Sequence, residues 1–345
     1  MSTNKKIIEV NRVKRKLSMF VCMLIIVLVA AACGSTASNE TAKAPAATTP
    51  APAASTPAPA AAPAAPTELT IKHQLGETKV KTNPKKVVVF DYGMLDTLDK
   101  LGIEVTGVAQ SSLPPYLAKY KDAKYKNIGT LQEPDFEKIN AMSPDLILIS
   151  GRQNASYAEL SKIAPTVFVG VDAKRYMDSF TENSKIIGKL FGKEAAVDAE
   201  LAKINESIKK VNAKAAGDNK KALITLVSGG KVTAYGPGSR FGIIHDVLNV
   251  VPAEKNIEVS THGQSISFEY IVEKNPDYLF VVDRETAVGE SKTTAKQVIE
   301  NELVKKTNAF KNGNIIYLDP NYWYLSGGGL ISTAAMIDEV DKGLK

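Results

Sequence analysis

The stretch FEKINAMSPDLILISGR at residues 136–152 recurs as FEYIVEKNPDYLFVVDR at residues 268–284. Both copies begin with Phe-Glu-x-Ile, pass through Pro-Asp into a strand-like apolar run, and end in arginine, Arg152 or Arg284. The matching positions stay in register without a gap, which indicates an internal repeat. Because the units of solenoid proteins are much shorter, a repeat of this size predicts two similar lobes.

Alternating helix and strand patterns surround both copies of the repeat. Within each copy, Pro-Asp ends the helical segment and an apolar run of strand length follows. Similar runs precede them in KKVVVFD (85–91) and KALITLVS (221–228). Since strands that alternate with helices favour parallel sheets, the sequence predicts an α/β protein with an N-terminal lobe at 69–174 and a C-terminal lobe at 216–345.

A helical tract at residues 175–215 separates the two predicted lobes. Val197, Leu201, Ile204 and Val211 are spaced so that they lie on one face of a helix. We expect one long helix to be the only link between the lobes. If the lobes face each other, the C-terminal ends of their strands border one cleft, where α/β proteins usually bind ligands.

Residues 1–32 are predicted to be a lipoprotein signal peptide. A basic front precedes the apolar run LSMFVCMLIIVLVAAAC, which is too short to favour a permanent membrane span. LVAAACGS resembles a bacterial lipobox with Cys33 as the lipidated residue, although Ala30 stands where Leu is commonest. A plain signal peptide and an uncleaved anchor are the alternatives.

The signal peptide also carries most of the charge. Residues 1–32 hold six Lys and Arg and one Glu, against a formal net charge of +6 for the whole chain. The remainder is nearly neutral, which argues against nucleic-acid binding. Residues 33–68 are rich in Ala, Pro, Ser and Thr, lack larger apolar side chains over most of their length, and are predicted to form an extended tether.

Three arginines are candidates for the predicted cleft. Arg152 and Arg284 follow equivalent strands of the repeat, and Arg240 lies in the Gly-Pro loop TAYGPGSRFG. Guanidinium groups gathered in one cleft suit a polyanion, since each charge-assisted hydrogen bond contributes about 1.5–3 kcal/mol. The alternative is that each arginine pairs with a nearby surface carboxylate such as Asp283.

Aromatic residues accompany these arginines. Trp323 and Tyr324 lie in YLDPNYWYLSGGGL, and Tyr92 follows the first strand of the N-terminal lobe. Arginines beside aromatic rings suit a ligand that is both anionic and aromatic. Core packing is the alternative for the aromatics. The triple glycine lacks the Lys-Ser/Thr of a P-loop, so it is only a weak phosphate signal.

Several motifs together resemble the siderophore-binding lipoproteins of bacterial ABC iron importers, closest to the petrobactin and catecholate-binding group of Bacillus. They are KKVVVFDYGMLDTLDKLGI, GSRFGIIHDVL, THGQSIS, NPDYLFVVDR and YLDPNYWYLSGGG. The resemblance implies two Rossmann-like lobes joined by one long helix, the class III substrate-binding-protein fold. It also implies a monomer anchored to the outer face of the cell membrane, which delivers a ferric siderophore to an ABC permease dimer.

The resemblance also implies roles for individual residues. Arg152, Arg240 and Arg284 match the ligand arginines of the family. Glu137 and Glu269, one in each copy of the repeat, match the glutamates that dock on the permease; the alternative is a helix-dipole role in the first helical turn. One departure is Ala109-Gln110, where some relatives place a cleft lysine.

The histidines give no recognisable metal-binding spacing. His262, in THGQS, resembles the histidine that, with a tyrosine such as Tyr324, completes iron coordination when a tetradentate siderophore leaves two iron positions open. Otherwise no direct metal ligand and no cofactor are expected. No catalytic motif or usable cysteine is present, so an enzyme is not expected, and the rival interpretation is a binding protein for another anionic ligand such as haem or a corrinoid.

Overall fold

The computed structural model describes residues 67–289 and 293–345. The predicted signal peptide, Cys33 and almost the whole predicted tether lie outside the described residues. Within these two ranges, no helix combines the length and the apolar character needed to cross a membrane.

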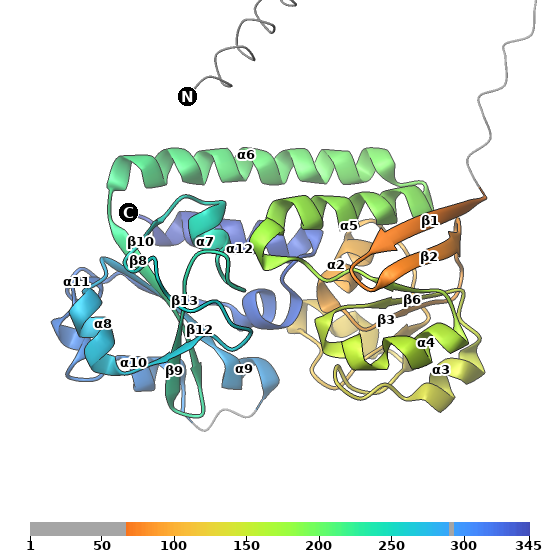
Figure 1. Cartoon of the computed structure of the whole chain (residues 1–345), viewed down its shortest axis with the longest axis horizontal. Helices are drawn as coiled ribbons and strands as arrows, with labels where there is room; N and C mark the ends of the chain where they lie inside the picture. Colours follow the sequence, from red (N-terminus) through yellow and green to blue (C-terminus); the bar gives the residue numbers. More distant parts are fainter. Residues whose placement is uncertain (1–66, 290–292) are drawn as a thin grey trace, which may run out of the picture. The chain divides into compact units, whose positions relative to one another are not determined.

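The first lobe contains a parallel sheet of five strands in the order β5-β4-β3-β6-β7 (Figure 1). Strands β3, β6 and β7 are buried along their whole length, as is typical of parallel sheets. An antiparallel hairpin, which the sequence analysis did not predict, precedes this sheet. The elements are β1 (Glu68–His73), β2 (Gly76–Lys81), β3 (Val87–Val89), α2 (Tyr92–Lys100), β4 (Gly107–Val108), β5 (Lys126–Asn127), α3 (Phe136–Met142), β6 (Leu146–Ile149), α4 (Tyr157–Ile163) and β7 (Thr166–Phe168).

The second lobe contains a mixed sheet in the order β11-β9-β8-β12-β13, with β10 also paired to β8. Strands β8, β10, β12 and β13 are parallel, whereas β9 and β11 are antiparallel to their neighbours. The elements are β8 (Lys221–Ser228), β9 (Lys231–Tyr235), α7 (Ile243–Asp246), β10 (Val251–Pro252), β11 (Gln264–Ile266), α8 (Phe268–Lys274), β12 (Tyr278–Asp283), α9 (Arg284–Val288), α10 (Ala295–Ile299), α11 (Asn308–Lys311) and β13 (Ile315–Leu318).

The preference for parallel strands that the sequence indicated therefore does not hold at β9. Gly229 and Gly230 connect β8 to β9 and both have positive φ, 55° and 75°. A two-residue turn of this kind closes an antiparallel hairpin, and Gly-Gly tolerates it because glycine has no Cβ. The Gly-Gly pair was the sequence signal for this hairpin.

The repeat is confirmed as a structural unit, since α3–β6 and α8–β12 are equivalent in the two lobes. In each copy, the aspartate of the Pro-Asp pair accepts hydrogen bonds from backbone amides at the start of a neighbouring strand, β3 in the first lobe and β8 in the second. Asp145 Oδ2 accepts hydrogen bonds from the amides of Lys85 and Lys86, both at 2.8 Å. Asp277 Oδ2 accepts one from the amide of Lys221 at 3.0 Å.

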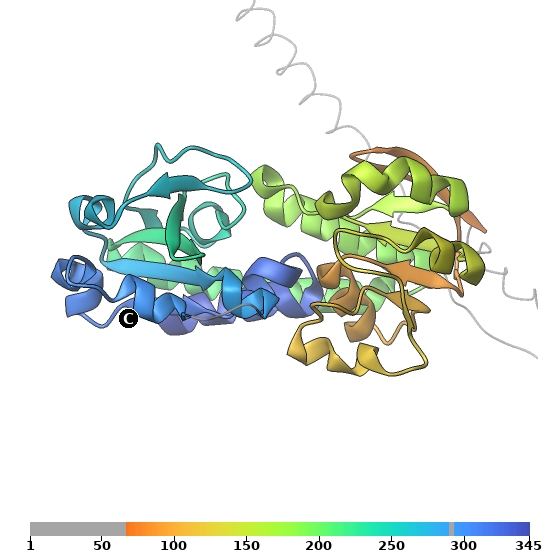
Figure 2. The same ribbon diagram turned by 90° about the horizontal axis from the view of Figure 1, so that it is seen from below.

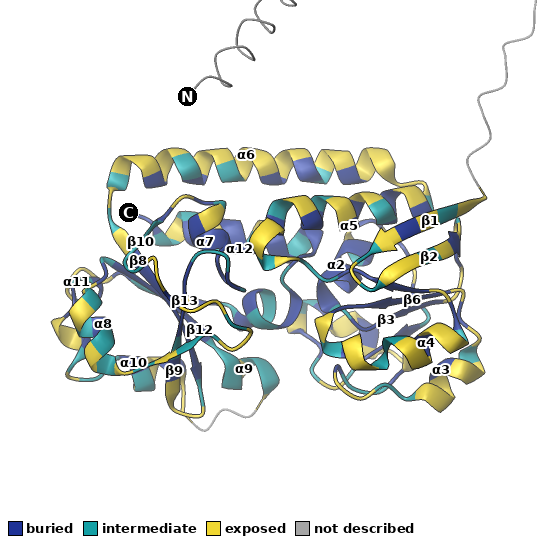
Figure 3. Cartoon of the chain, in the orientation of Figure 1, coloured by how far each residue is buried: buried dark blue, intermediate teal, exposed yellow. Residues whose placement is uncertain are grey.

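The tract between the lobes contains two helices, α5 (Tyr176–Phe191) and α6 (Glu194–Asp218), and not one. The break falls at Gly192, whose φ of 63° ends α5 in the left-handed region. Helix α6 lies along both lobes and over α5 and α12 (Figures 1 and 3). Its predicted apolar face is confirmed, because Val197, Leu201, Ile204 and Val211 are all buried.

A further contact between the lobes forms near the C-terminus, in addition to the chain connection through α5 and α6. Helix α12 (Leu330–Gly343) follows a π-helical turn, η5 (Asn321–Ser326), and packs against both α6 and α2 (Figure 2). The amides of Ile331 and Ser332 donate to the buried carboxylate of Asp96 on α2, at 3.1 and 3.0 Å. The first lobe thus caps the last helix of the chain.

The triple glycine is explained by this close packing. A Cβ on Gly329 would lie 1.9 Å from Asp96 Oδ1, and Gly328 has a φ of 108°. Gly93 on α2 is equally confined, since its Cβ would lie 2.3 Å from the carbonyl oxygen of Ser326. The glycines therefore allow two helices to approach each other.

Candidate functional site

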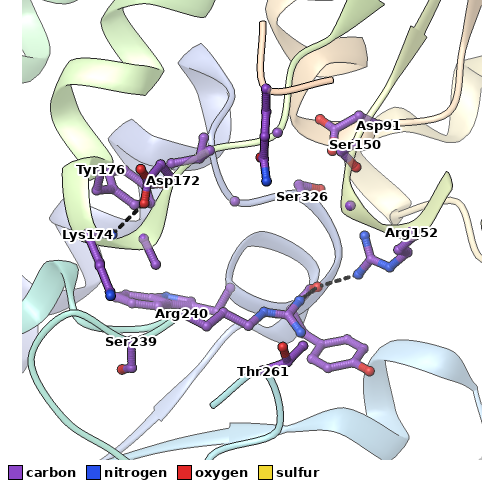
Figure 4. A pocket seen from close by; sticks show the side chains of 18 of the residues that line it. Asp91, Ser150, Arg152, Asp172, Lys174, Tyr176, Ser239, Arg240, Thr261 and Ser326 are labelled. Carbon is purple, nitrogen blue, oxygen red and sulfur yellow. Dashed lines mark hydrogen bonds between the residues drawn. The ribbon is translucent and has the colours of Figure 1, made fainter. Parts of the chain in front are cut away.

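A cleft of about 810 Å³ is lined by residues of both lobes (Figure 4). The first lobe contributes residues that follow its strands. The second lobe contributes two loops and the segment that leads into α12. The lining residues include Asp91, Ser150, Arg152, Lys174, Gly238, Arg240, Ser260, Thr261, Trp323 and Tyr324.

The three predicted arginines converge on one residue, Tyr324. Arg152 Nη2 donates to the Tyr324 carbonyl oxygen at 3.0 Å, and Arg240 Nη2 donates to the same oxygen. Arg284 Nε donates to the phenol oxygen at 3.1 Å. The three guanidinium carbons lie 6.0, 4.4 and 5.9 Å from the Tyr324 ring centroid, for Arg152, Arg240 and Arg284 respectively. Cations from both lobes therefore gather around one aromatic ring.

Of these arginines, Arg152 and Arg240 line the cleft itself. Burial lowers the pKa of Arg240, and the positive charge of Arg152 lowers it further. Burial and the charge of Arg152 both disfavour the charged form of the Arg240 guanidinium. An anion placed between the two arginines would stabilise this charged form. The electrostatics of the cleft therefore favour an anionic ligand.

Local hydrogen bonds fix the segments that carry these arginines. Arg152 lies in a 3₁₀ turn, η2 (Gly151–Ser156), where the Ser150 amide donates to Gln153 Oε1 at 3.1 Å. In the loop before Arg240, the Gly238 amide donates to Asp246 Oδ2 at 2.6 Å. The arginines are thus presented by ordered turns and not by loose loops.

Arg284 opens α9 and has a carboxylate neighbour. Its Nη1 lies 3.0 Å from Glu285 Oε1. Asp283, the partner considered for it from the sequence, caps α9 by accepting a hydrogen bond from the Thr286 amide at 3.1 Å. Arg284 does not line the cleft but meets the Tyr324 phenol beside it.

The predicted aromatic residues have different positions. Tyr324 lines the cleft, and Trp323 borders it while only 2% exposed, with its Nε1 donating to Glu339 Oε2 at 2.8 Å. Tyr92 is fully buried, and its hydroxyl donates to the Ala109 carbonyl at 2.8 Å. The placement of Tyr92 in the cleft is corrected, because the first residue of α2 points into the core and Asp91 before it reaches the cleft.

The histidines do not form a metal site in this structure. His262 is exposed and does not line the cleft, although Ser260 and Thr261 do. His245 is buried, and its Nδ1 lies 2.7 Å from the Val250 carbonyl oxygen, as expected for a structural role. Within residues 67–289 and 293–345, no group of three or more His, Cys, Asp or Glu side chains is arranged to hold a metal ion.

Sequence reasoning missed Asp91 and Lys174, which both line the cleft. Each follows a strand of the first-lobe parallel sheet, β3 for Asp91 and β7 for Lys174. The rule that selected Arg152 from the end of β6 could have found both. Burial raises the pKa of Asp91, while its hydrogen bonds with Ser150 and Met94 and the charge of Arg152 oppose that shift.

The two candidate docking glutamates lie at equivalent positions of the repeat. Glu137 is in the first turn of α3 and Glu269 is in the first turn of α8. Both side chains are exposed, and neither forms an ion pair with another residue in the described part of the chain. Amide and hydroxyl hydrogen bonds at the start of α8 lower the pKa of Glu269.

Comparison with known proteins identifies the family of this chain. Residues 87–322 match the family described as periplasmic binding protein. The chain belongs to this family. The petrobactin-binding protein of Bacillus subtilis is 56% identical over 282 residues, 81% of this chain and 89% of that protein. The ferric-anguibactin-binding protein of Vibrio anguillarum is 35% identical over 283 residues, 80% of this chain and 88% of that protein.

Solved structures of family members agree with the fold. The crystal structure of the Bacillus subtilis petrobactin-binding protein matches with a TM-score of 0.79 and 56% identity, over 81% of this chain and 99% of that one. The periplasmic catecholate-siderophore binding protein of Vibrio cholerae matches with a TM-score of 0.77 and 40% identity, over 80% of this chain and 99% of that one. The predicted class III fold, two α/β lobes joined by a long helix, is confirmed.

The family match covers part of the candidate site. Residues 87–322 include all three arginines and both candidate glutamates. The match ends just before Trp323 and Tyr324, which complete the arginine cluster and the edge of the cleft.

Proposed function

We propose that this protein is a solute-binding protein that captures a ferric siderophore, of the petrobactin or another catecholate type, for an ABC iron importer. The observation that carries the proposal is the convergence of Arg152, Arg240 and Arg284 on Tyr324 at the cleft. The similar proteins described above are petrobactin-, ferric-anguibactin- and catecholate-siderophore-binding proteins, which supports the same ligand class.

The chemistry of such a ligand suits this cleft. A ferric catecholate complex carries about three negative charges and presents aromatic rings, so guanidinium groups and the Tyr324 ring can both contact it. The iron is held by the siderophore, and the protein needs no cofactor. Direct coordination by His262 and Tyr324 is proposed only for a tetradentate siderophore that leaves two iron positions open.

The remaining parts of the chain fit a surface-anchored delivery protein. We propose that Cys33 carries the lipid at the outer face of the cell membrane and that residues 33–68 form the tether. We further propose that the monomer docks on the two permease subunits through Glu137 and Glu269. Their equivalent positions in the two lobes support this role, since a roughly two-fold partner needs one contact on each lobe.

The test is a titration of the purified protein that follows the emission of Trp323, its only tryptophan, which borders the cleft. Ferric petrobactin, a ferric tris-catecholate, a ferric hydroxamate, the iron-free siderophores, haem and a corrinoid are compared, with calorimetry in parallel. We expect that only the catecholate-type ferric complexes quench the Trp323 emission and give a heat of binding in the calorimeter. Binding of haem or a corrinoid with none of the siderophores would replace the proposal with the other anionic ligand class.

A further inference from the structure

Lys174 is a fourth basic residue at the cleft. It lies in a short 3₁₀ turn, Ala173–Arg175, that follows β7, and Asp172 Oδ1 fixes this turn by accepting a hydrogen bond from the Lys174 amide at 2.9 Å. The side chain lines the cleft and is exposed. Its backbone is therefore held in place while its ammonium group remains accessible.

The lysine side chain reaches from the first lobe toward the second. Its Cγ lies beside Gly238, 3.9 Å from where a Cβ on that glycine would be. Gly238 belongs to the loop that presents Arg240, and Figure 4 shows Lys174 extending toward that loop. A ligand held by Arg240 would therefore lie within reach of the lysine.

The lysine differs from the arginines in its partners. Arg152 and Arg240 donate to the Tyr324 carbonyl, and Arg284 contacts the Tyr324 phenol and Glu285. Within residues 67–289 and 293–345, the Lys174 ammonium has no hydrogen bond or ion pair. All three of its donors are thus available to a ligand.

We propose that Lys174 is a further ligand-binding residue that pairs with an anionic oxygen of the bound complex and sets the preference of the cleft for highly charged ligands. The inference rests on the proposed function and deepens it. An ammonium group on a flexible stem is a point charge, so it can follow ligands of different shape that the fixed guanidinium groups cannot. Lys174 would therefore add charge selectivity without demanding one ligand geometry.

The experiment compares the wild-type protein with Lys174→Gln and Lys174→Arg. Each is titrated with a triply anionic ferric tris-catecholate and with an uncharged ferric trihydroxamate, at low and at high salt. Lys174→Gln should weaken binding of the anionic complex roughly three- to tenfold, should leave any binding of the uncharged complex unchanged, and should flatten the salt dependence. Lys174→Arg should keep most of the affinity, because it keeps the charge.

The matched control is Lys185→Gln, which replaces an exposed lysine on α5 that does not line the cleft. It should bind both complexes as the wild type does. If the wild type binds the anionic complex and Lys174→Gln binds it equally well with the same salt dependence, the inference is wrong while the proposed function stands. If the wild type binds no siderophore, both are overturned.

Discussion

The side chain of Arg152 in the first lobe donates to the backbone carbonyl of Tyr324 at 3.0 Å, although the two residues are 172 positions apart in the sequence. Arg240 donates to the same carbonyl from the second lobe. One carbonyl oxygen therefore holds two like charges near each other despite their mutual repulsion. The cation cluster at the cleft depends on where η5 places a single peptide group.

The first prediction concerns the relative importance of the arginines. Arg240→Ala should weaken ferric siderophore binding by about 1.5–3 kcal/mol, the range for hydrogen bonds to charged groups. Arg284→Ala should cost less, because Glu285 already offsets its charge and it does not line the cleft. Titration of both variants measures the order. Equal or reversed losses would contradict the larger contribution predicted for Arg240.

The second prediction concerns pH and Asp96. Burial raises the pKa of this carboxyl from 3.8 to about 7, although the Ile331 and Ser332 amides and the Ser332 and Tyr116 hydroxyls oppose the shift. A carboxyl with a raised pKa binds its proton more tightly in the folded protein. Its contribution to the free energy of unfolding is therefore fully present below about pH 4 and is lost as the pH rises to about 7.

Asp96→Asn tests this pH dependence because an amide of similar shape does not titrate. The wild type should lose stability relative to the variant by up to about 1.4 kcal/mol per pH unit across this window. Urea unfolding of both proteins at several pH values gives the difference. Two parallel stability curves would show that Asp96 does not titrate in the predicted window.

The third prediction concerns the contact between α2 and α12. A methyl group on Gly329 would lie 1.9 Å from Asp96 Oδ1 and 2.1 Å from the Gly93 carbonyl oxygen. Gly329→Ala should lower the free energy of unfolding by about 1–3 kcal/mol, the usual cost of overpacking. Gly217→Ala in α6 is the control, since nothing lies within 4 Å of its Cβ position. Equal stability of the two variants in thermal unfolding would argue against the tight contact.

The fourth prediction separates docking from ligand binding. Glu137→Ala combined with Glu269→Ala should leave siderophore affinity unchanged and stop iron uptake in cells that depend on this protein. The control pair is Glu159→Ala with Glu302→Ala, which also removes one exposed glutamate from each lobe. Uptake at the wild-type rate by the first pair would refute the docking role, and uptake by the control pair should be normal.

The fifth prediction concerns the lipid anchor. Cys33→Ser should release the protein from the membrane into the soluble fraction, because no other attachment is expected once residues 1–32 are removed. Fractionation of cells that produce either form, followed by immunoblotting, measures this. A variant that stays in the membrane would mean that the apolar segment of the signal peptide is retained.

Local patterns were enough to predict the repeated units and the apolar face of α6. Helix periodicity, the Pro-Asp stop and β-branched runs act over a few residues, so they can be recognised in one sequence. The positions of Arg152 and Arg284 followed from the same patterns, because a residue that ends a parallel strand lies at a known edge of the sheet. The resemblance to siderophore-binding proteins then supplied the ligand class.

Other features depended on segments far apart in the chain. No local pattern indicates that Tyr92 turns into the core while Asp91 faces the cleft. Nor does any local pattern indicate that α12 returns to the first lobe, where Asp96 caps it. The position of α12 depends on how the helices pack. The difference between Asp91 and Tyr92 arises because neighbouring residues at the start of a helix can face opposite ways.

Local hydrophobic periodicity and turn signals are enough to predict two α/β lobes, their repeated helix–strand unit and arginines at the ends of strands. The meeting of Arg152, Arg240 and Arg284 at Tyr324, and the presence of Lys174 in the same cleft, emerge only from the folded chain. Such contacts are set by the packing of elements that are distant in the sequence, which local patterns do not specify.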